Sequence, residues 1–292
     1  PSDTPFQGCG QGNGAGPTMW VAISAVLITM MAAEGCGFSS LSALSSLLVV
    51  ADCFCFVDDS DVVQASDSVY TTGESLLPSV QNALNLWTGG VSATGGAITP
   101  DKSFWWLFDF QWCPALGMWK FRRKSNLPGD ITMIAPDGNL VTLNRKEPEE
   151  AEKTLGVMMA PDGNETAQFT KLHTAALEWS RTVSSSYTLQ RDIIPMLTTT
   201  ILKTLEYPMA LTTFSAEMWT KIMSRPLMVC LPKAGVCRSF PRSVVYAPLR
   251  FQGLGIPHPF AIQVSTHVDN LLRHGPNLTN TVTNLKAALE AH

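Results

Sequence analysis

Apolar residues follow two successive patterns along the 292-residue chain, one typical of strands and one typical of helices. Up to about residue 165, most apolar residues fall in short runs separated by turns rich in Gly, Pro, Asn and Asp. From residue 166 onward they recur at the three- and four-residue spacing of an amphipathic helix. The sequence therefore predicts an α+β domain over residues 1–165 and a mainly helical domain over residues 166–292.

Two helices are expected in the first domain. Residues 19–33 are almost wholly apolar and follow a glycine-rich loop that ends at Pro17, a residue suited to a first helical turn. At about fifteen residues this segment is shorter than the ~20 needed to cross a bilayer, so we expect a buried core helix and no membrane contact. A second helix is expected over residues 75–87, with Gly89-Gly90 as its stop.

The strands of the first domain are predicted from apolar runs next to turn residues. A buried strand over residues 47–57 is followed by the polar turn Asp58-Asp59-Ser60-Asp61 and a return over residues 62–64. Further strands are expected at 103–112, in a hairpin over 131–143, and at 153–159. In the second domain, helices are expected near residues 166–184, 188–205, 214–224, 261–273 and 279–291.

The net charge of −4 conceals an uneven distribution along the chain. Residues 1–118 carry ten Asp and Glu against a single Lys, whereas residues 167–292 carry twelve Lys and Arg against six acids. An acidic front followed by a basic tail is expected where one part holds cations and the other follows phosphates, although solvated surface charge would produce the same asymmetry.

The pair Asp58-Asp59 is the most informative local feature, because it lies at the tip of a predicted hairpin whose first strand is buried. Two adjacent carboxylates repel each other unless cations or hydrogen-bond donors offset the repulsion. Magnesium prefers such hard oxygen ligands, and polymerases use two magnesium ions in nucleotidyl transfer. Exposed turns also favour Asp for conformational reasons, so the pair alone does not establish a metal site.

The order of motifs resembles the palm of reverse transcriptases, especially those of non-LTR retroelements. The resemblance consists of Gly-x-Gly-Gln-Gly-x-x-x-Gly-Pro, an apolar helix, a buried strand ending in aromatic-x-Asp-Asp, a helix, Gly-Gly-x-x-x-Pro-x-Lys and Lys-x-Leu-Gly-Val. It is most specific between residues 7 and 160 and continues more faintly to a Gly-Leu-Gly segment at 253–255. It implies a palm made of an antiparallel sheet with helices on one face, followed by a helical thumb-like domain.

By this resemblance, Asp58 and Asp59 are the catalytic carboxylates that bind two Mg²⁺ ions, and Lys102 lies near the incoming triphosphate. The resemblance implies that template and nucleotide are contacted by Gln11, Gly12 and Phe56, and the primer end by Leu155 and Gly156. The activity it implies is RNA-directed DNA polymerisation, with an RNA template, a DNA primer and deoxynucleoside triphosphates as partners.

The chain departs from the family pattern in two places. Gly16 stands where the family usually has a serine before the proline. The family's first catalytic aspartate lies upstream of the glutamine-glycine loop, where only six residues precede Gln7. We therefore expect the chain to lack the fingers and part of the palm, to be inactive alone, and to expose both a free strand edge and the apolar face of the helix at 19–33.

Two groups of basic residues are candidates for nucleic-acid binding. Lys120, Arg122, Arg123 and Lys124 lie beside Trp119, whose ring offers a stacking plane, although a plain solvated turn would look similar. The second group, in the predicted thumb-like domain, lies in a stretch without acids between Glu217 and Asp269 and includes Arg238, Arg242 and Arg250.

Other functions remain open at this stage. Another palm polymerase, such as an RNA-dependent RNA polymerase, also ends a strand in Asp-Asp, and a non-catalytic remnant of a retroelement could bind nucleic acid without copying it. A membrane protein built on the two apolar segments is a third alternative. The seven cysteines do not form disulfide or zinc spacings, which favours an intracellular location, nuclear or cytoplasmic.

Overall fold

The computed structural model describes residues 15–42, 44–56, 59–66, 68, 71–275 and 279–291. Two compact units are distinguished by their internal contacts. Unit 1 contains residues 1–148 and 277–292, and unit 2 contains residues 149–276. The boundary thus lies nearer the N-terminus than the predicted position at 165, and the last helix groups with unit 1 instead of with the helical part.

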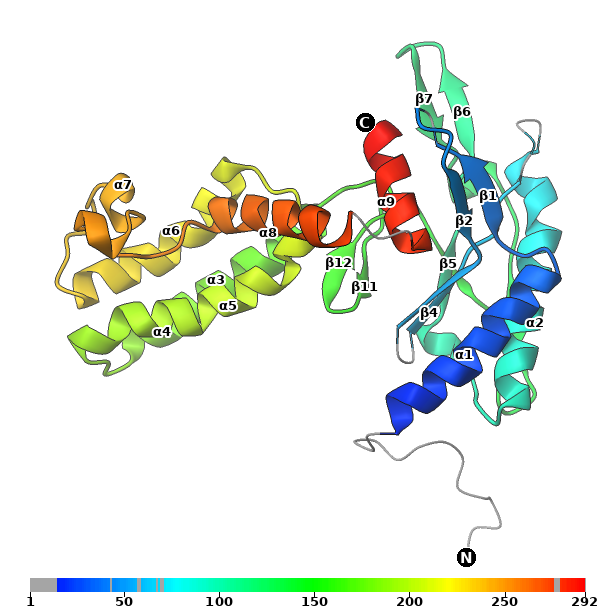
Figure 1. The fold of residues 1–292 in the computed structure, drawn as a ribbon, viewed down its shortest axis with the longest axis horizontal. Helices are drawn as coiled ribbons and strands as arrows, with labels where there is room; N and C mark the ends of the chain where they lie inside the picture. The colour runs from blue at the N-terminus through cyan, green and yellow to red at the C-terminus, as the bar shows by residue number, and fades with distance from the viewer. Residues whose placement is uncertain are drawn as a thin grey trace, which may run out of the picture. The chain divides into compact units, whose positions relative to one another are not determined.

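Both helices and strands build unit 1, which confirms a mixed architecture in coarse form (Figure 1). In its described residues the strands pair two by two, and only one of these pairs is parallel, so the single antiparallel sheet that was expected is not formed. The antiparallel pairs are β1 (Phe38–Leu41) with β2 (Leu48–Ala51), β3 (Cys53–Phe56) with β4 (Asp59–Val62), β6 (Phe110–Cys113) with β7 (Met118–Phe121), and β8 (Thr132–Ile134) with β9 (Leu140–Thr142); the parallel pair is β5 (Phe104–Trp106) with β10 (Asn144–Lys146).

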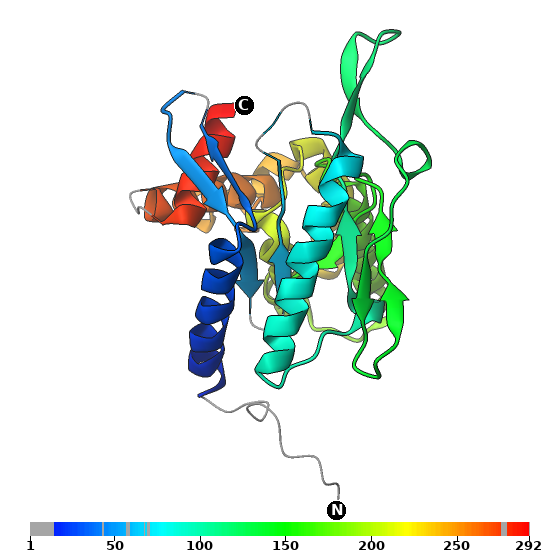
Figure 2. The same cartoon turned by 90° about the vertical axis from the view of Figure 1, so that its right-hand side faces the viewer.

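Helices α1 (Gly16–Ala33) and α2 (Gly73–Ala93) lie side by side in front of the strands in Figure 2. They share an apolar core in which Leu27 and Met31 of α1 meet Trp87 and Val91 of α2. Gly90 lies at this contact, since a Cβ on it would stand 2.7 Å from a methyl group of Leu27. The predicted stop at Gly89-Gly90 was wrong: Gly90 permits the close approach of α1, and α2 continues to Ala93.

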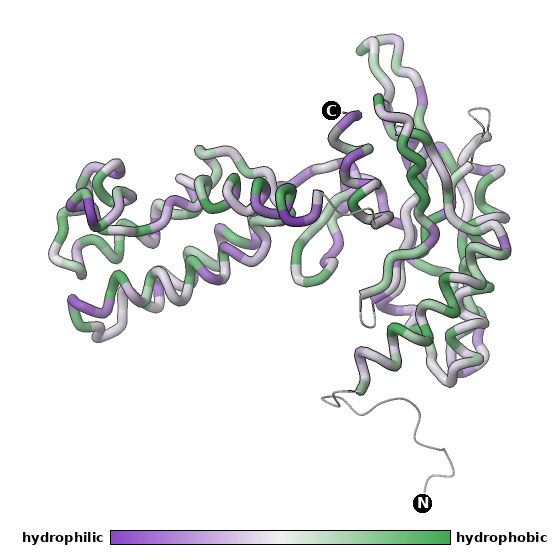
Figure 3. The backbone as a smooth tube through the Cα atoms, in the orientation of Figure 1, coloured by the Kyte–Doolittle hydropathy of each residue, from purple (hydrophilic) through white to green (hydrophobic). Residues whose placement is uncertain are grey.

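Helix α1 buries one face only, so the core helix expected over residues 19–33 packs in the core with one face and exposes apolar residues on another. Its buried residues are Ser24, Leu27 and Met31, whereas Val26 on another face is 69% exposed. Hydrophobic colour covers much of the helix in Figure 3. Among the described residues, α1 is the one helix whose length and composition would allow it to cross a membrane, a test that core helices also pass.

A second core of unit 1 lies under the first half of α2. Gln81 of α2 fastens the helix to β8, since its amide donates to the Thr132 carbonyl (2.7 Å) and its oxygen accepts from the Thr132 N–H (2.9 Å). The guanidinium of Arg145, almost fully buried, donates to the Leu127 carbonyl and lies over the Trp105 ring. A buried charge is tolerated there because it has both a hydrogen-bond acceptor and an aromatic face.

Unit 2 begins with one hairpin and continues as helices packed around an apolar core. The hairpin joins β11 (Glu152–Thr154) to β12 (Val157–Met159). The helices that follow agree with the predicted helical half. They are α3 (Thr166–Ser185), α4 (Ile193–Thr199), α5 (Ile201–Glu206), α6 (Ala216–Lys233), α7 (Arg242–Val245) and α8 (Pro259–His274), and α9 (Asn280–Ala291) belongs to unit 1.

Two helices of unit 2 differ in extent from the prediction. The single helix expected over 188–205 is interrupted at Thr200, whose hydroxyl donates to the Met196 carbonyl (2.6 Å) and accepts the indole N–H of Trp179 (2.8 Å). Helix α6 passes through Pro226 and ends nine residues later than expected. Burial of Pro226 and of Leu227 in the core offsets the hydrogen bond that proline removes.

Candidate functional site

The predicted catalytic hairpin is formed by β3 and β4, and its register places the described acidic residues. Phe56 pairs with Asp59, Cys55 with Ser60, and Phe54 with Asp61. Asp58 lies outside the described residues, as do Gln11 and Gly12. Asp59 opens β4 with an exposed side chain, so β4 begins earlier than the return predicted at 62–64. The Asp59 carboxylate is therefore accessible to a cation from solvent.

The opposite side of the β3–β4 hairpin faces the apolar core. Cys53 and Cys55 alternate along β3 and share a face, with their sulfur atoms 3.4 Å apart, and both pack against the α1–α2 core. Burial raises the pKa of the Cys53 thiol, helped by the Cys55 contact. A thiol kept protonated in this way is a packing group, as the sequence suggested, and holds the hairpin against the helices.

Acidic charge is concentrated on β4. Partial removal of water by neighbouring protein atoms raises the pKa of the Asp61 carboxyl, and the nearby charge of Asp59 raises it further. A site that resists ionisation in this way favours a bound cation, which would relieve the repulsion. Among the described residues, no three Asp, Glu, His or Cys side chains are grouped closely enough to hold a metal. The described carboxylates therefore do not form a metal site by themselves.

Lys102 lies in the short 3₁₀ turn Pro100–Lys102, between α2 and β5. Its side chain is exposed, and its N–H donates to the Thr99 carbonyl (3.2 Å). In the part of unit 1 that is described, no hydrogen bond or ion pair joins Lys102 to the β3–β4 hairpin. Its predicted role at the triphosphate stays a prediction.

Leu155 and Gly156 form the turn of the β11–β12 hairpin, and the single strand predicted over residues 153–159 was wrong. Both residues have left-handed backbone conformations, with φ values of 48° and 86°. Such a two-residue turn reverses the chain, and Gly156 accommodates it without strain. The Tyr207 hydroxyl donates to the Leu155 carbonyl (2.7 Å), and the Lys171 ammonium donates to the Gly156 carbonyl. The turn is therefore held in place by the helices of unit 2.

The basic group at residues 120–124 divides into two kinds of residue. Lys120, Arg123 and Lys124 are exposed. Arg122 instead donates to the Asp109 carboxylate (2.8 Å) and to the Asn126 carbonyl (2.8 Å). This engagement makes Arg122 a structural residue first, and leaves phosphate contacts to its neighbours.

The second basic group lies in unit 2 between α6 and α8. Arg238, Arg242 and Arg250 are all exposed, and Arg250 lies over the Phe251 ring at 4.9 Å from its centroid. The Gly-Leu-Gly segment folds back on α7, with the Gly255 N–H donating to the Ala247 carbonyl (2.9 Å). These exposed cations, in a stretch without acidic residues, suit a polyanion.

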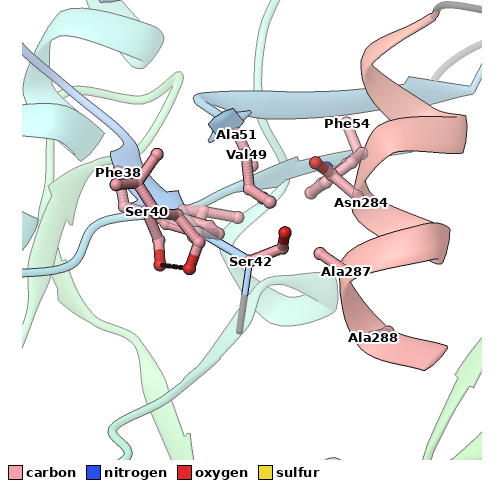
Figure 4. Close-up of a pocket in the computed structure, with 11 residues that line it drawn as sticks. Phe38, Ser40, Ser42, Val49, Ala51, Phe54, Asn284, Ala287 and Ala288 are labelled. Atoms are coloured by element: carbon pink, nitrogen blue, oxygen red, sulfur yellow. Dashed lines mark hydrogen bonds between the residues drawn. The ribbon is translucent and has the colours of Figure 1, made fainter. Parts of the chain in front are cut away.

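An open groove of about 630 Å³ lies in unit 1 between the β1–β2 pair and α9 (Figure 4). Figure 4 shows Phe54, Val49 and Asn284 at one end of it and Ser42 with Ala287 at the other. The groove has no ionisable side chain in its lining, so it offers no acid or base to activate the hydroxyls of Ser40 and Ser42. Phe54 comes from the β3–β4 hairpin, but the described acidic residues of that hairpin, Asp59 and Asp61, do not line the groove.

Comparison with known proteins gives no match: no family model, no curated protein and no solved structure is similar to this chain. The functional assignment therefore depends on the residues and geometry of the chain itself.

Two features of unit 1 escaped the sequence analysis. One is the contact between Asp109 and Arg122, which joins residues thirteen apart and has no local signal. The other is the aromatic hairpin β6–β7, whose mirrored segments Phe-Gln-Trp and Trp-Lys-Phe at 110–112 and 119–121 are visible in the sequence.

Proposed function

We propose that this chain is the palm and thumb-like part of a reverse transcriptase, which transfers deoxynucleotides to a primer 3′-hydroxyl on an RNA template. The observation that carries the proposal is the β3–β4 hairpin, which lies in the chain between α1 and α2 and pairs Phe56 with Asp59. This order of helix, acidic hairpin and helix is the order that the family resemblance implies.

Under this proposal, Asp58 and Asp59 hold magnesium through carboxylate oxygens, the ligand type that magnesium prefers. The ions would neutralise the charge that develops at the transferred phosphate. Two-metal catalysis needs carboxylates on both sides of the ions, and β4 supplies one side. The proposal therefore requires an upstream fingers and palm region that carries a further aspartate, and it predicts an intracellular enzyme.

Primer extension tests the proposal. The chain is mixed with RNA template, DNA primer, magnesium and deoxynucleotides, alone and with the upstream region that the proposal requires. We expect extension only with the added region, and its loss in Asp58→Asn and Asp59→Asn. Asp137→Asn is the matched control, because Asp137 is also an exposed acid in a hairpin turn of unit 1.

The possible results separate the alternatives. Incorporation of ribonucleotides in place of deoxynucleotides would identify an RNA-dependent RNA polymerase. Extension that survives both Asp58→Asn and Asp59→Asn would refute the assignment of the hairpin. Magnesium-dependent extension by the chain alone, sensitive to Asp58→Asn, would refute the need for a further segment.

A non-catalytic nucleic-acid-binding protein is the second candidate, favoured by the exposed Arg238, Arg242 and Arg250 in a stretch without acids. It predicts binding to duplex or hybrid nucleic acid without extension. Affinity should fall with salt at a log-log slope of about −0.9 per phosphate neutralised. Replacing the three arginines together by alanine should flatten that slope, and binding that is independent of salt would exclude this surface.

A further inference from the structure

Helix α9 (Asn280–Ala291) returns to unit 1 after the chain has passed through unit 2. It packs against the β1–β2 pair, on the side of the strands opposite α1 and α2 (Figures 1 and 2). The expected palm has helices on one face of its strands, whereas α9 adds a helix on the other face. The resemblance assigns no role to this helix.

The register of the β3–β4 hairpin shows which of its faces lies toward α9. Residues that pair directly in an antiparallel ladder place their side chains on the same face, and successive residues alternate between faces. Phe54 pairs with Asp61, and Asp59 lies two residues before Asp61 on β4, so these three share a face. Cys53 and Cys55 lie on the other face, against the α1–α2 core. Because Phe54 lines the groove beside α9 (Figure 4), α9 packs on the face that carries Asp59 and Asp61, here called the acidic face.

The position of α9 conflicts with nucleic acid at the proposed metal site. Asp59 lies only two residues from the Phe54–Asp61 pair, about 7 Å along an antiparallel strand. The major groove of a duplex is by itself about 12 Å wide. A duplex whose primer end lies at Asp59 is therefore wider than this offset and competes with α9 for the space above Phe54.

The packing of α9 on the strands is loose. The side chains that it presents to the groove are small, Ala287 and Ala288 with Asn284, and an open volume of about 630 Å³ remains there. Among the described side chains of α9, Val282 alone is buried. The Asn284 Oδ1 atom is buried and accepts no hydrogen bond from any described residue, which disfavours the docked position. A helix of 12 residues is also marginally stable by itself. These properties favour release of α9 by local opening, without unfolding of the unit.

A polar contact at the end of α9 opposes this release. The Glu290 carboxylate accepts the backbone N–H groups of Leu44 and Ser45, which lie between β1 and β2, at 3.1 and 3.0 Å. The contact is exposed to water, so it can break without uncovering apolar core. Loose packing along the helix and a polar contact at its end are the properties of a cover that can be displaced.

We propose that α9 is an autoinhibitory cover, which lies on the acidic face of the β3–β4 hairpin, is held there by Glu290, and is displaced by the primer–template duplex. The proposal rests on the proposed function for the identity of the displacing ligand. While α9 is docked, only the fraction of chains in the open state is competent to bind, so the apparent affinity is reduced by that fraction.

Hydrogen exchange of the full chain at pH 7 tests the cover without any ligand. We expect the α9 amides to exchange faster than the α2 amides. Glu290→Gln should speed α9 exchange about 2- to 20-fold, the range for loss of an exposed hydrogen bond. Asn284→Leu should slow it, because leucine fills part of the groove and removes the unpaired oxygen. Glu178→Gln is the matched control, since Glu178 is an exposed acid on α3 of unit 2.

Binding of a fluorescein-labelled RNA–DNA hybrid, measured by anisotropy without nucleotides, tests the competition. Glu290→Gln should tighten binding about 2- to 20-fold and Asn284→Leu should weaken it, because the two changes shift α9 in opposite directions. Glu178→Gln should leave affinity unchanged. Saturating hybrid should speed exchange of the α9 amides, since α9 leaves the strands when the duplex binds.

Several results would overturn the proposal. They are exchange of α9 at the rate of α2 in the chain and in both variants, equal hybrid affinity of Glu290→Gln and Asn284→Leu, slower α9 exchange with hybrid, and no binding of hybrid by any variant. Primer extension that depends on Asp59, together with equal affinities, would refute the cover and leave the polymerase standing. Opposite shifts in affinity in a chain that never extends a primer would support the cover and refute only the polymerase.

Discussion

Replacement of Gln263 by leucine should destabilise unit 2 strongly, although the two side chains are similar in size. Gln263 lies on α8 with a side chain that is 3% exposed. Its oxygen accepts the indole N–H of Trp219 (2.9 Å) and the Thr212 hydroxyl (3.3 Å), and its amide donates to the Phe214 carbonyl (3.0 Å). One polar side chain thus satisfies three buried groups.

The expected loss follows from two of these three groups. A buried donor or acceptor left without a partner costs about 1–3 kcal/mol. The Trp219 N–H and the Phe214 carbonyl are both orphaned in Gln263→Leu, whereas the Thr212 hydroxyl can rotate to another acceptor. We therefore expect the free energy of unfolding of unit 2 to fall by about 2–5 kcal/mol, allowing for some apolar gain from leucine.

The assay is urea unfolding followed by hydrogen exchange of the α6 and α8 amides, which reports on unit 2 separately. Gln190→Leu is the matched control, since Gln190 is exposed and makes one hydrogen bond to the Ala234 carbonyl. Adding Trp219→Phe to Gln263→Leu should cost less than the two single changes together, because the orphaned N–H is gone. Losses within about 0.5 kcal/mol of each other for Gln263→Leu and Gln190→Leu would refute the reasoning.

Three further predictions concern single ionisable groups. The raised pKa of Asp61 means that ionisation of its carboxyl opposes folding, so Asp61→Asn should raise the melting temperature at neutral pH. This gain should vanish below pH 3.8, because the wild-type carboxyl is then protonated in both the folded and the unfolded state. Hydrogen bonds from the Ser45 side chain and backbone lower the pKa of Glu290 to about 2. The contact between Glu290 and Ser45 should therefore persist above pH 4.5 and weaken as the pH falls toward 2. Faster hydrogen exchange of α9 in Glu290→Gln at pH 7 would confirm that this contact stabilises α9, and unchanged exchange would contradict it. If Lys102 protonates the leaving pyrophosphate, Lys102→Ala should slow single-turnover incorporation by the complete enzyme about ten- to ten-thousandfold without changing primer affinity, and weakened affinity at normal rate would contradict that role.

The elements that were predicted well are those whose signals are local. The α3 helix matches the expected 166–184 within a residue, because its apolar spacing and its neighbours in the chain determine it. The hairpin around Asp137 also agrees, since its Asp and Gly residues favour a turn between two short strands, and the Asp137 carboxylate accepts the Asn139 N–H (3.0 Å).

Helix ends were mispredicted where a residue that destabilises a helix is compensated by packing against a distant part of the chain. Gly90 and Pro226 both suggest a helix end when only the neighbouring residues are considered. Gly90 is retained within α2 because α1 approaches too closely for a side chain, and Pro226 within α6 because it is buried in the core. The sequence shows the cost of each residue but not the packing that offsets it.

The strand predicted over 103–112 was divided for a similar reason. Apolar and aromatic residues continue through the segment, so periodicity alone gives one strand. The structure breaks it near Asp109, whose carboxylate turns to the start of α2 and to Arg122. Asp109 therefore lies between β5 and β6 and positions the start of β6. The two residues that hold its carboxylate, Gly73 and Arg122, are both distant from it in sequence.

The candidate site was predicted to the extent that it is local. The hairpin that joins β3 to β4 was predicted from residues continuous in sequence. The single strand expected over 47–57 was wrong, because the structure divides it into β2, which pairs with β1, and β3, which pairs with β4. A metal site also depends on carboxylates from other segments, and the described residues of the chain bring no third ligand to Asp59. Lys102 and the Leu155-Gly156 turn were assigned by resemblance, and in the described part of the hairpin no hydrogen bond or ion pair reaches Lys102.

A further strand beside β3 would serve both the stability of the hairpin and the proposed metal site. Within the described residues β3 pairs with β4 alone, so its other edge has backbone groups without a strand partner. Under the proposed function, Asp59 also needs a carboxylate on the opposite side of the two metal ions. A strand that paired with the free edge of β3 and ended in an aspartate would meet both demands at once. Stability and activity should therefore rise together when such a strand is supplied, because the hydrogen bonds that hold it also position its carboxylate.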